Sequence, residues 1–337
     1  MSKPINLKND TTMKPPHDHD ETTRFPFLQG ILPITVSRIP SEIVAGITLA
    51  AIAVPEVMGY TKISGTPVIT GLYTMLIPTA LFALFGSSRH LVVGADSATA
   101  AILAAGLVGI ASVGSDQYLA LAGVLELTAA VFLILARVMR LGFLADFLSR
   151  TVLIGFLTGV GVQVALGQIA GMLGLESGGH GTLGKFWNDL QQLGQINRYE
   201  LTIALAVLVV IVGLKKVSKS IPGALIAVIG ALVASWAFGF DKHVHVIGAV
   251  PSGLPHLGLP AVDWNWQVIT TLIPTAFAMF VVILAQSAAT SRAYATRYDE
   301  SFSENSDLVG LALANIGAGL SGTFVVNGSP TKTQIVD

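Results

Sequence analysis

The sequence contains no cysteine, which excludes disulfide bonds, thiolate metal sites and thiol catalysis. Charged residues are scarce at 12% of the chain, whereas a soluble domain usually carries about 25%. The sequence also lacks a basic cluster for nucleic acid, a Gly-rich phosphate loop, a catalytic triad and a metal-ligand set. We therefore expect no enzymatic activity, no catalytic residue, no cofactor or resident metal, and no nucleic-acid partner.

Apolar residues dominate what remains. They make up 52% of the chain, and the mean hydropathy is +0.70. The 35 glycines agree with a membrane protein, because small residues let membrane helices approach closely. Apolar runs of roughly 20 residues, enough to cross a bilayer, predict spans at 42–60, 67–85, 116–136, 150–173, 199–217, 221–240, 266–291 and 307–326. We expect an all-α protein embedded in the lipid bilayer.

The first 35 residues are polar and contain no apolar core of a signal peptide. They predict a disordered cytoplasmic tail at 1–35. Within it, one short run could bind a metal, but a disordered polar tail is the commoner explanation for such a run. That run is His17, Asp18, His19 and Asp20.

The positions of Lys and Arg predict the orientation in the membrane. With the N-terminus in the cytoplasm, Lys332 lies in the membrane and few of the 19 basic residues lie outside. The outside ones are Lys62, Lys185, Arg198 and Lys242. This arrangement places loops 174–198 and 241–265 outside, and it requires residues 96–110 to cross as a full or half span.

Two short pieces, 96–110 and 329–337, look like broken helices. In the first, Asp96 or Ser97 can cap an Ala-rich run. In the second, Ser329 can cap and Pro330 takes the favoured first helical position. Two helix starts facing each other at membrane depth would offer free N–H groups and positive dipole ends to an anion. The alternative is that both are ordinary capped helices at the membrane surface.

Several motifs resemble those of the SulP (sulfate permease) anion transporters. The first set is Pro55, Pro67, Gly71-Leu72-Tyr73, Pro78, Gly86-Ser87-Ser88 and Gly94. Further matches are Gly155-Phe156, Gly159, Gln168, Ile221–Ile226, Ile247-Gly248, Pro251–Pro255, Leu313–Ile316 and the 327–333 cluster. The resemblance covers about residues 40–337.

The resemblance implies a fold of two inverted repeats of seven spans, with substrate held between half-helices at spans 3 and 10. Residues 36–240 would form the first repeat, with spans 1–7, and 241–337 an incomplete second repeat, with spans 8–10. The sequence stops at Asp337, in the tenth span, so the cytoplasmic STAS domain of many members is expected to be absent. A homodimer is left open.

The site residues follow from the two half-helices and the resemblance. The expected substrate-binding residues are Ala98, Thr99, Ser329, Thr331, Lys332 and Thr333. The expected coupling residues are Glu56, Asp96, Gln286 and Thr290. Relative to the family pattern, the chain has acids at Glu56 and Asp96 and lacks one at Gln286. The alternatives are a plain N-cap for Asp96, a hydrogen-bonded carboxyl for Glu56, and a Lys332 that extends to the outer surface.

The resulting hypothesis is secondary transport of small inorganic anions, such as sulfate or bicarbonate, across the inner or plasma membrane. Coupling to protons or exchange is expected, because a carboxyl group at membrane depth can carry a proton. The alternatives are a nucleobase permease of the same fold, a non-transporting membrane protein, and a channel.

Overall fold

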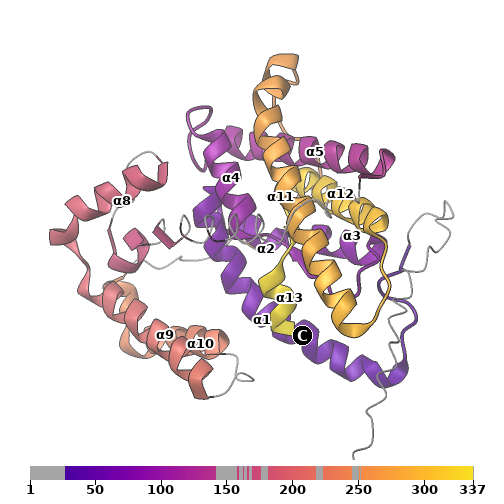
Figure 1. Cartoon of the computed structure of the whole chain (residues 1–337). Coiled ribbons are helices and arrows are strands. Elements are labelled where there is room, and N and C mark those ends of the chain that lie inside the picture. Colours follow the sequence, from indigo (N-terminus) through magenta and orange to yellow (C-terminus); the bar gives the residue numbers. More distant parts are fainter. Residues whose placement is uncertain are drawn as a thin grey trace, which may run out of the picture.

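The computed structural model is helical and describes residues 27–141, 158, 162, 165–166, 169–175, 181–217, 223–244, 250 and 252–336 (Figure 1). The helices of the first part are α1 (Ile39–Ser64), α2 (Val68–Tyr73), α3 (Ile77–Phe85), α4 (Ser97–Leu107) and α5 (Asp116–Val138). Later come α8 (Gly181–Gln191), α9 (Arg198–Val217), α10 (Gly223–Phe238), α11 (Trp266–Tyr298), α12 (Glu304–Leu320) and α13 (Pro330–Val336). Two short strands, β1 (Val93–Gly94) and β2 (Asn327–Gly328), and 3-10 turns at Val36–Arg38, Leu193–Gln195 and Phe240–Lys242 complete the described elements.

Most of the predicted spans coincide with helices in the part of the chain that the structure describes. Among the described residues, four segments are long and apolar enough to cross a membrane: Ile39–Ser64, Val68–Phe85, Asp116–Val138 and Trp266–Tyr298. They coincide with the predicted spans at 42–60, 67–85, 116–136 and 266–291. Helices α9 and α10 occupy the predicted spans at 199–217 and 221–240. Helix α12 fills only the first part of the predicted span at 307–326, because it ends at Leu320 and the chain then runs without helix toward β2. Most of the predicted span at 150–173 lies outside the described residues, as does the run from His17 to Asp20.

The predicted span at 67–85 is interrupted. It consists of α2 and α3, and the backbone between them leaves helical geometry at Leu76, with φ −97 and ψ −95. Pro78 explains the break, because proline has no N–H to donate and its ring crowds the preceding turn. A fresh helix then begins with this proline in its first turn. The span rule counts apolar length and therefore does not detect such a break.

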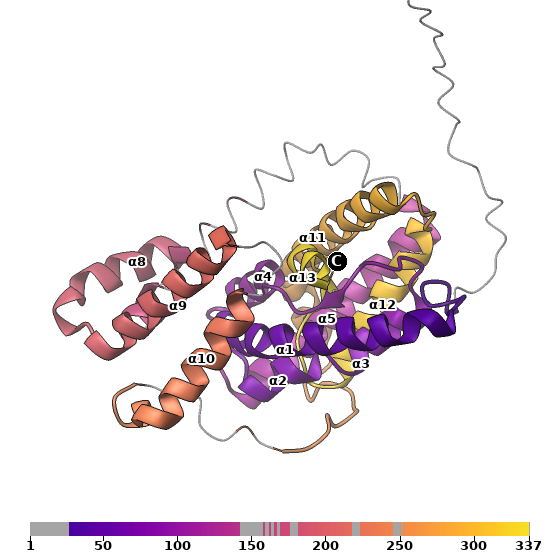
Figure 2. The same ribbon diagram turned by 90° about the horizontal axis from the view of Figure 1, so that it is seen from below.

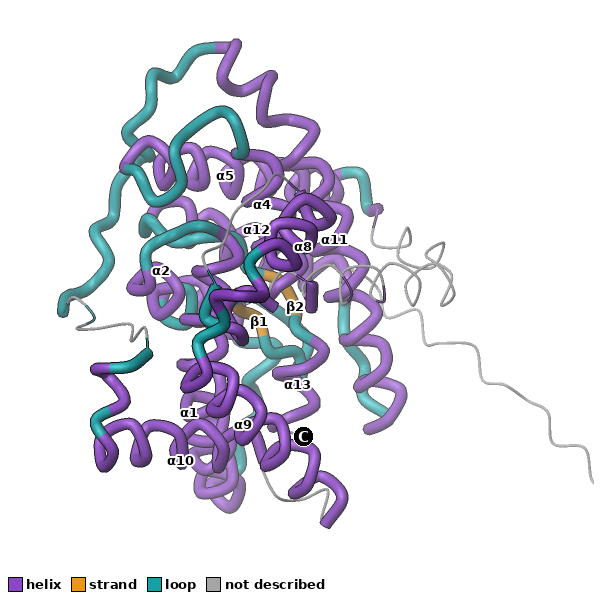
Figure 3. The backbone as a smooth tube through the Cα atoms, turned by 90° about the vertical axis from the view of Figure 1, so that its left-hand side faces the viewer, coloured by secondary structure: helices purple, strands orange, loops and turns teal. Residues whose placement is uncertain are grey.

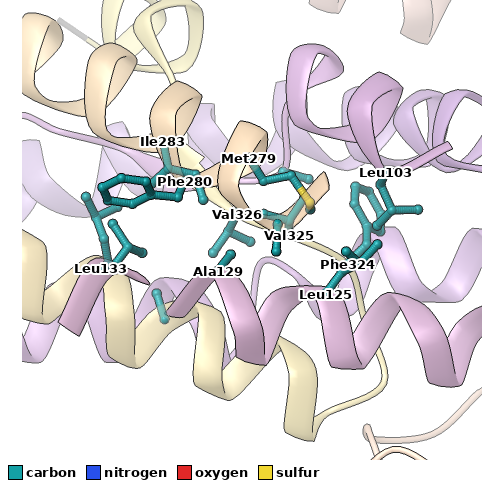
Figure 4. Packing of buried hydrophobic residues seen from close by; sticks show 14 of the residues in the cluster. Leu103, Leu125, Ala129, Leu133, Met279, Phe280, Ile283, Phe324, Val325 and Val326 are labelled. Atoms are coloured by element: carbon teal, nitrogen blue, oxygen red, sulfur yellow. The ribbon is translucent and has the colours of Figure 1, made fainter. Parts of the chain in front are cut away.

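The core lies between α5, α11 and α12, with α3 and α4 packed against them. Figure 4 shows apolar side chains of α5 and α11 meeting those of the extended segment that follows α12. Close helix approach depends on glycine: a Cβ added to Gly319 of α12 would lie 2.9 Å from the carbonyl oxygen of Gly123 in α5. The tight packing holds the segment 323–326 in place, and that segment leads directly into β2.

Helices α8, α9 and α10 lie to one side of this core in two perpendicular views (Figures 1 and 2). Helix α9 packs on α10, and α10 also contacts α1. Helix α1 contacts α2, α4 and α13 as well. It therefore lies between the side group of helices and the core.

At the predicted tail's end, residues 27–35 are described, and part of them lies against α3. The backbone N–H of Leu28 donates to the carbonyl of Leu84 at 2.6 Å, and that of Gly30 donates to the carbonyl of Gly86 at 3.2 Å. Phe27 also packs against Phe85, with ring centroids 5.7 Å apart.

The two strands place α4 and α13 (Figure 3). They pair antiparallel, with Val93 opposite Gly328 and Gly94 opposite Asn327. The backbone N–H of Ser329 extends the pairing by donating to the carbonyl of Val92 at 2.9 Å. Helix α4 begins shortly after β1 and α13 shortly after β2. The antiparallel ladder therefore brings the first turns of the two helices together, although they are separated by more than two hundred residues in sequence.

Candidate functional site

Helix α4 begins with a buried acidic cap. Asp96 is 7% exposed, and its Oδ1 accepts hydrogen bonds from the Thr99 backbone N–H at 2.9 Å and the Thr99 hydroxyl at 2.7 Å. This confirms a capped start, and it selects Asp96 rather than Ser97 as the cap. One free N–H of the first turn is thus already occupied by a negative group of the chain itself.

Helix α13 begins as the capping rules predict. Pro330 is its first residue, and the Ser329 hydroxyl accepts a hydrogen bond from the Lys332 backbone N–H at 3.3 Å. Ser329 is 1% exposed. The capping residues of both helices, Asp96 and Ser329, are therefore buried within the molecule.

Lys332 points from α13 toward α1 and the start of α4. Its ammonium lies 3.4 Å from Glu56 Oε2 and donates to the carbonyl of Ala95. The same ammonium lies 5.0 Å from the centre of the Tyr60 ring, within range of a cation–π contact. Lys332 is 2% exposed, so the alternative in which it extends to the surface is wrong in this structure.

Glu56 is held by a neighbour on its own helix. The Tyr60 hydroxyl, one turn along α1, donates to Glu56 Oε1. The other oxygen, Oε2, has no hydrogen bond within the described part of the chain and faces the Lys332 ammonium. The Glu56 side chain as a whole is 22% exposed, but its Oε2 atom is buried.

A second polar layer joins β2 to α11. The Asn327 amide donates to both Asp96 Oδ2, at 3.1 Å, and Gln286 Oε1. Asn327 is 0% exposed, and its own Oδ1 lacks a hydrogen-bond partner among the described residues. The Thr290 hydroxyl donates back to the Gln286 carbonyl at 2.8 Å. Gln286 is therefore linked to Asp96 through Asn327, Thr290 lies one turn along α11, and part of the oxygen capacity of both residues is already used.

The structure brings most of the predicted site residues together. Thr99 and Ala98 are buried in the first turn of α4, and Glu56, Asp96, Gln286 and Lys332 form the connected polar group just described. Two predicted residues have other surroundings. Thr333 accepts a hydrogen bond from the Val92 backbone N–H at 3.0 Å, which ties α13 to β1. Thr331 is exposed, and its hydroxyl lies 3.1 Å from that of Ser329.

Sequence analysis missed Tyr60, Asn327 and the Ala95 carbonyl as members of the site. Tyr60 was detectable, because residues four apart share a helix face and Tyr60 follows Glu56 by that spacing. Asn327 carried the weaker signal of an amide just before a capped helix start. The Ala95 carbonyl carries no signal in sequence, since its role depends on the approach of a distant lysine.

A third buried acid fixes the loop before β1. Asp307 in α12 is 4% exposed and accepts hydrogen bonds from the Ser87 and Ser88 backbone N–H groups, at 2.7 and 2.9 Å. Its other oxygen accepts from the Ser291 hydroxyl of α11 at 3.0 Å. Asp307 thus ties α11 and α12 to the loop that leads toward Asp96.

The site has the components of an anion site that contains its own counter-charges. One ammonium and two helix starts attract negative charge, while Glu56 and Asp96 supply two carboxylates. Glu56 Oε2 lies 3.4 Å from the Lys332 ammonium, and Asp96 directly follows Ala95, whose carbonyl accepts from the same ammonium. Within the described residues no group of three or more His, Asp or Glu side chains suitable for a metal ion is found.

Comparison with protein families and curated proteins gives a consistent result. The model of the sulfate permease family matches residues 39–337. A probable sulfate transporter of Mycobacterium tuberculosis, MT1781, is 32% identical over 297 residues, which cover 88% of this chain and 53% of that protein. The chloroplastic sulfate transporter 4.1 of Arabidopsis thaliana is 26% identical over 87% of this chain and 44% of its own length. The chain thus spans about half the length of these curated relatives.

Solved structures share the fold. The transmembrane domain of the cyanobacterium bicarbonate transporter BicA has a TM-score of 0.81 at 23% identity, covering 90% of this chain and 78% of that one. The murine solute carrier 26 family member A9 anion transporter in the inward-facing state has a TM-score of 0.84 at 20% identity, covering 96% of this chain and 58% of that one. At these identities the likeness concerns the fold alone.

Proposed function

The chain belongs to the sulfate permease family, and we propose that it forms the anion-binding part of a membrane transporter for small inorganic anions such as sulfate or bicarbonate. The observation that carries the proposal is the buried Lys332 ammonium beside the joined starts of α4 and α13. Buried charges at membrane depth are costly and mark substrate or ion pathways.

The proposed architecture is that of an inverted-repeat transporter. Residues 36–240 belong to the first seven-span repeat and 241–337 to the second, with α4 and α13 as the half-helices of spans 3 and 10. The pairing of β1 with β2 and the nearby starts of α4 and α13 support this assignment. The N-terminus lies in the cytoplasm, as the distribution of Lys and Arg favours.

Lys332 supplies the main attraction for the anion. In the described state its charge is shared between Glu56 and the Ala95 carbonyl. An anion at the helix starts would compete with Glu56 for the ammonium, because both are negative and both need the same donor. Anion binding is therefore strongest when Glu56 carries a proton and no longer pairs with Lys332.

This competition supplies a mechanism for coupling. Protonation of Glu56 ends its ion pair with the Lys332 ammonium. The anion then takes the place of the Glu56 carboxylate beside Lys332, so the proton and the anion are bound at the same time. Loss of the proton restores the ion pair and expels the anion. Glu56 suits the role because its Oε2 faces the Lys332 ammonium directly and its side chain is more exposed than that of Lys332.

Sodium coupling is less well supported at the α11 position. The side-chain amide oxygen of Gln286 is neutral and already accepts a hydrogen bond from Asn327. The Thr290 hydroxyl donates to the backbone carbonyl of Gln286. A hard cation such as Na⁺ favours several oxygen ligands, and carboxylates strengthen such a site. We therefore propose coupling to protons.

The test is anion uptake by the full-length protein in proteoliposomes under imposed gradients. Uptake of sulfate or bicarbonate should be driven by an inwardly directed proton gradient, with the outside more acidic, and should show no dependence on a sodium gradient. Glu56→Gln, which cannot pair with Lys332 as a carboxylate, should retain anion binding but lose its pH dependence. Asp116→Asn, at an exposed position at the start of α5, is the matched control and should behave as the wild type.

Other outcomes separate the alternatives. Uptake driven by sodium alone would refute proton coupling, and unchanged pH dependence in Glu56→Gln would make Glu56 a structural residue. Uptake of uracil or xanthine in place of anions would indicate a nucleobase permease. Currents that do not saturate with anion concentration would indicate a channel.

A further inference from the structure

We propose that Asp96 is a specificity-determining residue that makes the site favour singly charged over doubly charged anions. The inference rests on the proposed function and adds the charge of the preferred substrate to it. It follows from the location of the Asp96 carboxylate and from the balance of charges around it.

Asp96 occupies part of the space and part of the donors that an anion at α4 would use. Its Oδ1 takes both the backbone N–H and the hydroxyl of Thr99. Its Oδ2 takes the amide of Asn327, which is fully buried. These three partners are all donors, the surroundings that an ionised carboxylate needs. The helix start thus already holds one negative charge that belongs to the chain.

The charges of the site do not balance. With all groups ionised, Glu56 and Asp96 outweigh Lys332, and the site carries one net negative charge. Protonation of Glu56 brings the sum to zero, but Asp96 remains as a fixed negative charge beside the incoming anion. Among the described residues, no Lys or Arg is found in hydrogen-bond or ion-pair contact with Asp96, and the nearby Lys332 pairs with Glu56 instead.

Repulsion from a fixed charge grows in proportion to the charge of the anion. Asp96 therefore penalises a doubly charged anion twice as much, in free energy, as a singly charged anion at the same position. The factor by which Asp96 lowers the affinity for a doubly charged anion is therefore the square of the factor for a singly charged anion. This relation is specific to an electrostatic role, because a packing effect of the side chain would act on both anions alike.

Sulfate and perchlorate are suitable probes, because both are tetrahedral ions with four oxygens and they differ in charge. Each anion is compared with itself in wild type and variant, so differences in hydration cancel. Asp96→Asn removes the charge and keeps a good helix cap. If it raises perchlorate affinity about tenfold, a free-energy change of about 1.4 kcal/mol, it should raise sulfate affinity about a hundredfold.

Three further variants make the result interpretable. Asp96→Glu keeps the charge and should leave the ratio of sulfate to perchlorate affinity near that of the wild type. Asp116→Asn removes an exposed carboxylate at the start of α5, outside the candidate site, and should change neither affinity. If Asp96→Asn does not yield folded protein, Asp96→Ser, which also caps a helix, can be used to compare the sulfate and perchlorate affinities in the same way.

Equal changes for the two anions in Asp96→Asn, or no change in either, would overturn the inference. The proposed function fails in a different way: Lys332→Ala would then leave the binding of both anions unaltered. If Lys332→Ala weakens the binding of both anions and Asp96→Asn changes both affinities by the same factor, the proposed function stands. Only the role proposed for Asp96 is then refuted.

Discussion

Replacing Lys332 by alanine tests the site through its central charge. The ammonium is buried and contacts Glu56, the Ala95 carbonyl and the Tyr60 ring. Losing a charge-assisted contact to a bound anion costs about 1.5–3 kcal/mol, which weakens binding roughly 10- to 100-fold. Equilibrium binding of sulfate to the purified full-length protein measures this loss.

The same substitution also affects the protein without an anion. It leaves Glu56 Oε2 without its ammonium, and breaking a fully buried pair costs roughly 3–5 kcal/mol of stability. Although the Glu56 side chain as a whole is 22% exposed, the Oε2 atom that loses its partner is buried, so we expect a measurable part of this cost. Thermal unfolding of the same samples therefore has to accompany the binding measurement.

A double variant separates the two effects. Lys332→Ala combined with Glu56→Gln removes both charges, so no unpaired carboxylate remains. If Lys332 contacts the anion, the double variant should regain stability and still bind weakly. Recovery of binding to the wild-type level in the double variant would show that Lys332 acts only by neutralising Glu56, and the reasoning would be refuted.

Two further predictions concern packing and orientation. Gly106→Ala should destabilise the fold, because its Cβ would lie 2.2 Å from Thr275 Cγ2. The loss, measured by thermal or denaturant unfolding, should be about 1–3 kcal/mol, the usual cost of overpacking. Gly46→Ala is the control: nothing lies within 4 Å of its added Cβ, so it should be neutral or stabilising. In intact cells an impermeant thiol reagent should label a cysteine at Ser252 and not one at Ser301, both exposed positions; labelling of Ser301 alone would reverse the orientation.

Local rules were sufficient for the helix starts of the site. Capping chemistry depends on a few adjacent residues, so Asp96 before α4 and Ser329-Pro330 before α13 were recognisable from the sequence. Apolar length was sufficient for most spans. The interruption near Leu76 was missed because the length rule ignores the missing N–H of Pro78.

Long-range contacts account for what could not be predicted. The donation from Lys332 to Ala95 joins residues 237 positions apart, and the bond from Ser87 to Asp307 joins residues 220 positions apart. A single sequence contains no signal for such pairs, since each residue has several chemically acceptable partners. Lys332 was therefore recognised as an attractive charge, but its pairing with Glu56 became apparent only from the fold.

The central claim is that an anion binds between the first turns of α4 and α13, beside Lys332. Anomalous scattering from crystals of the full-length protein soaked in selenate tests it directly, because selenium marks the position of a sulfate-like anion. The account predicts a selenium peak within contact distance of the Lys332 ammonium and the N-terminal turns of both helices, weakened in Lys332→Ala crystals. A peak elsewhere in the membrane region, unaffected by Lys332→Ala, would contradict it.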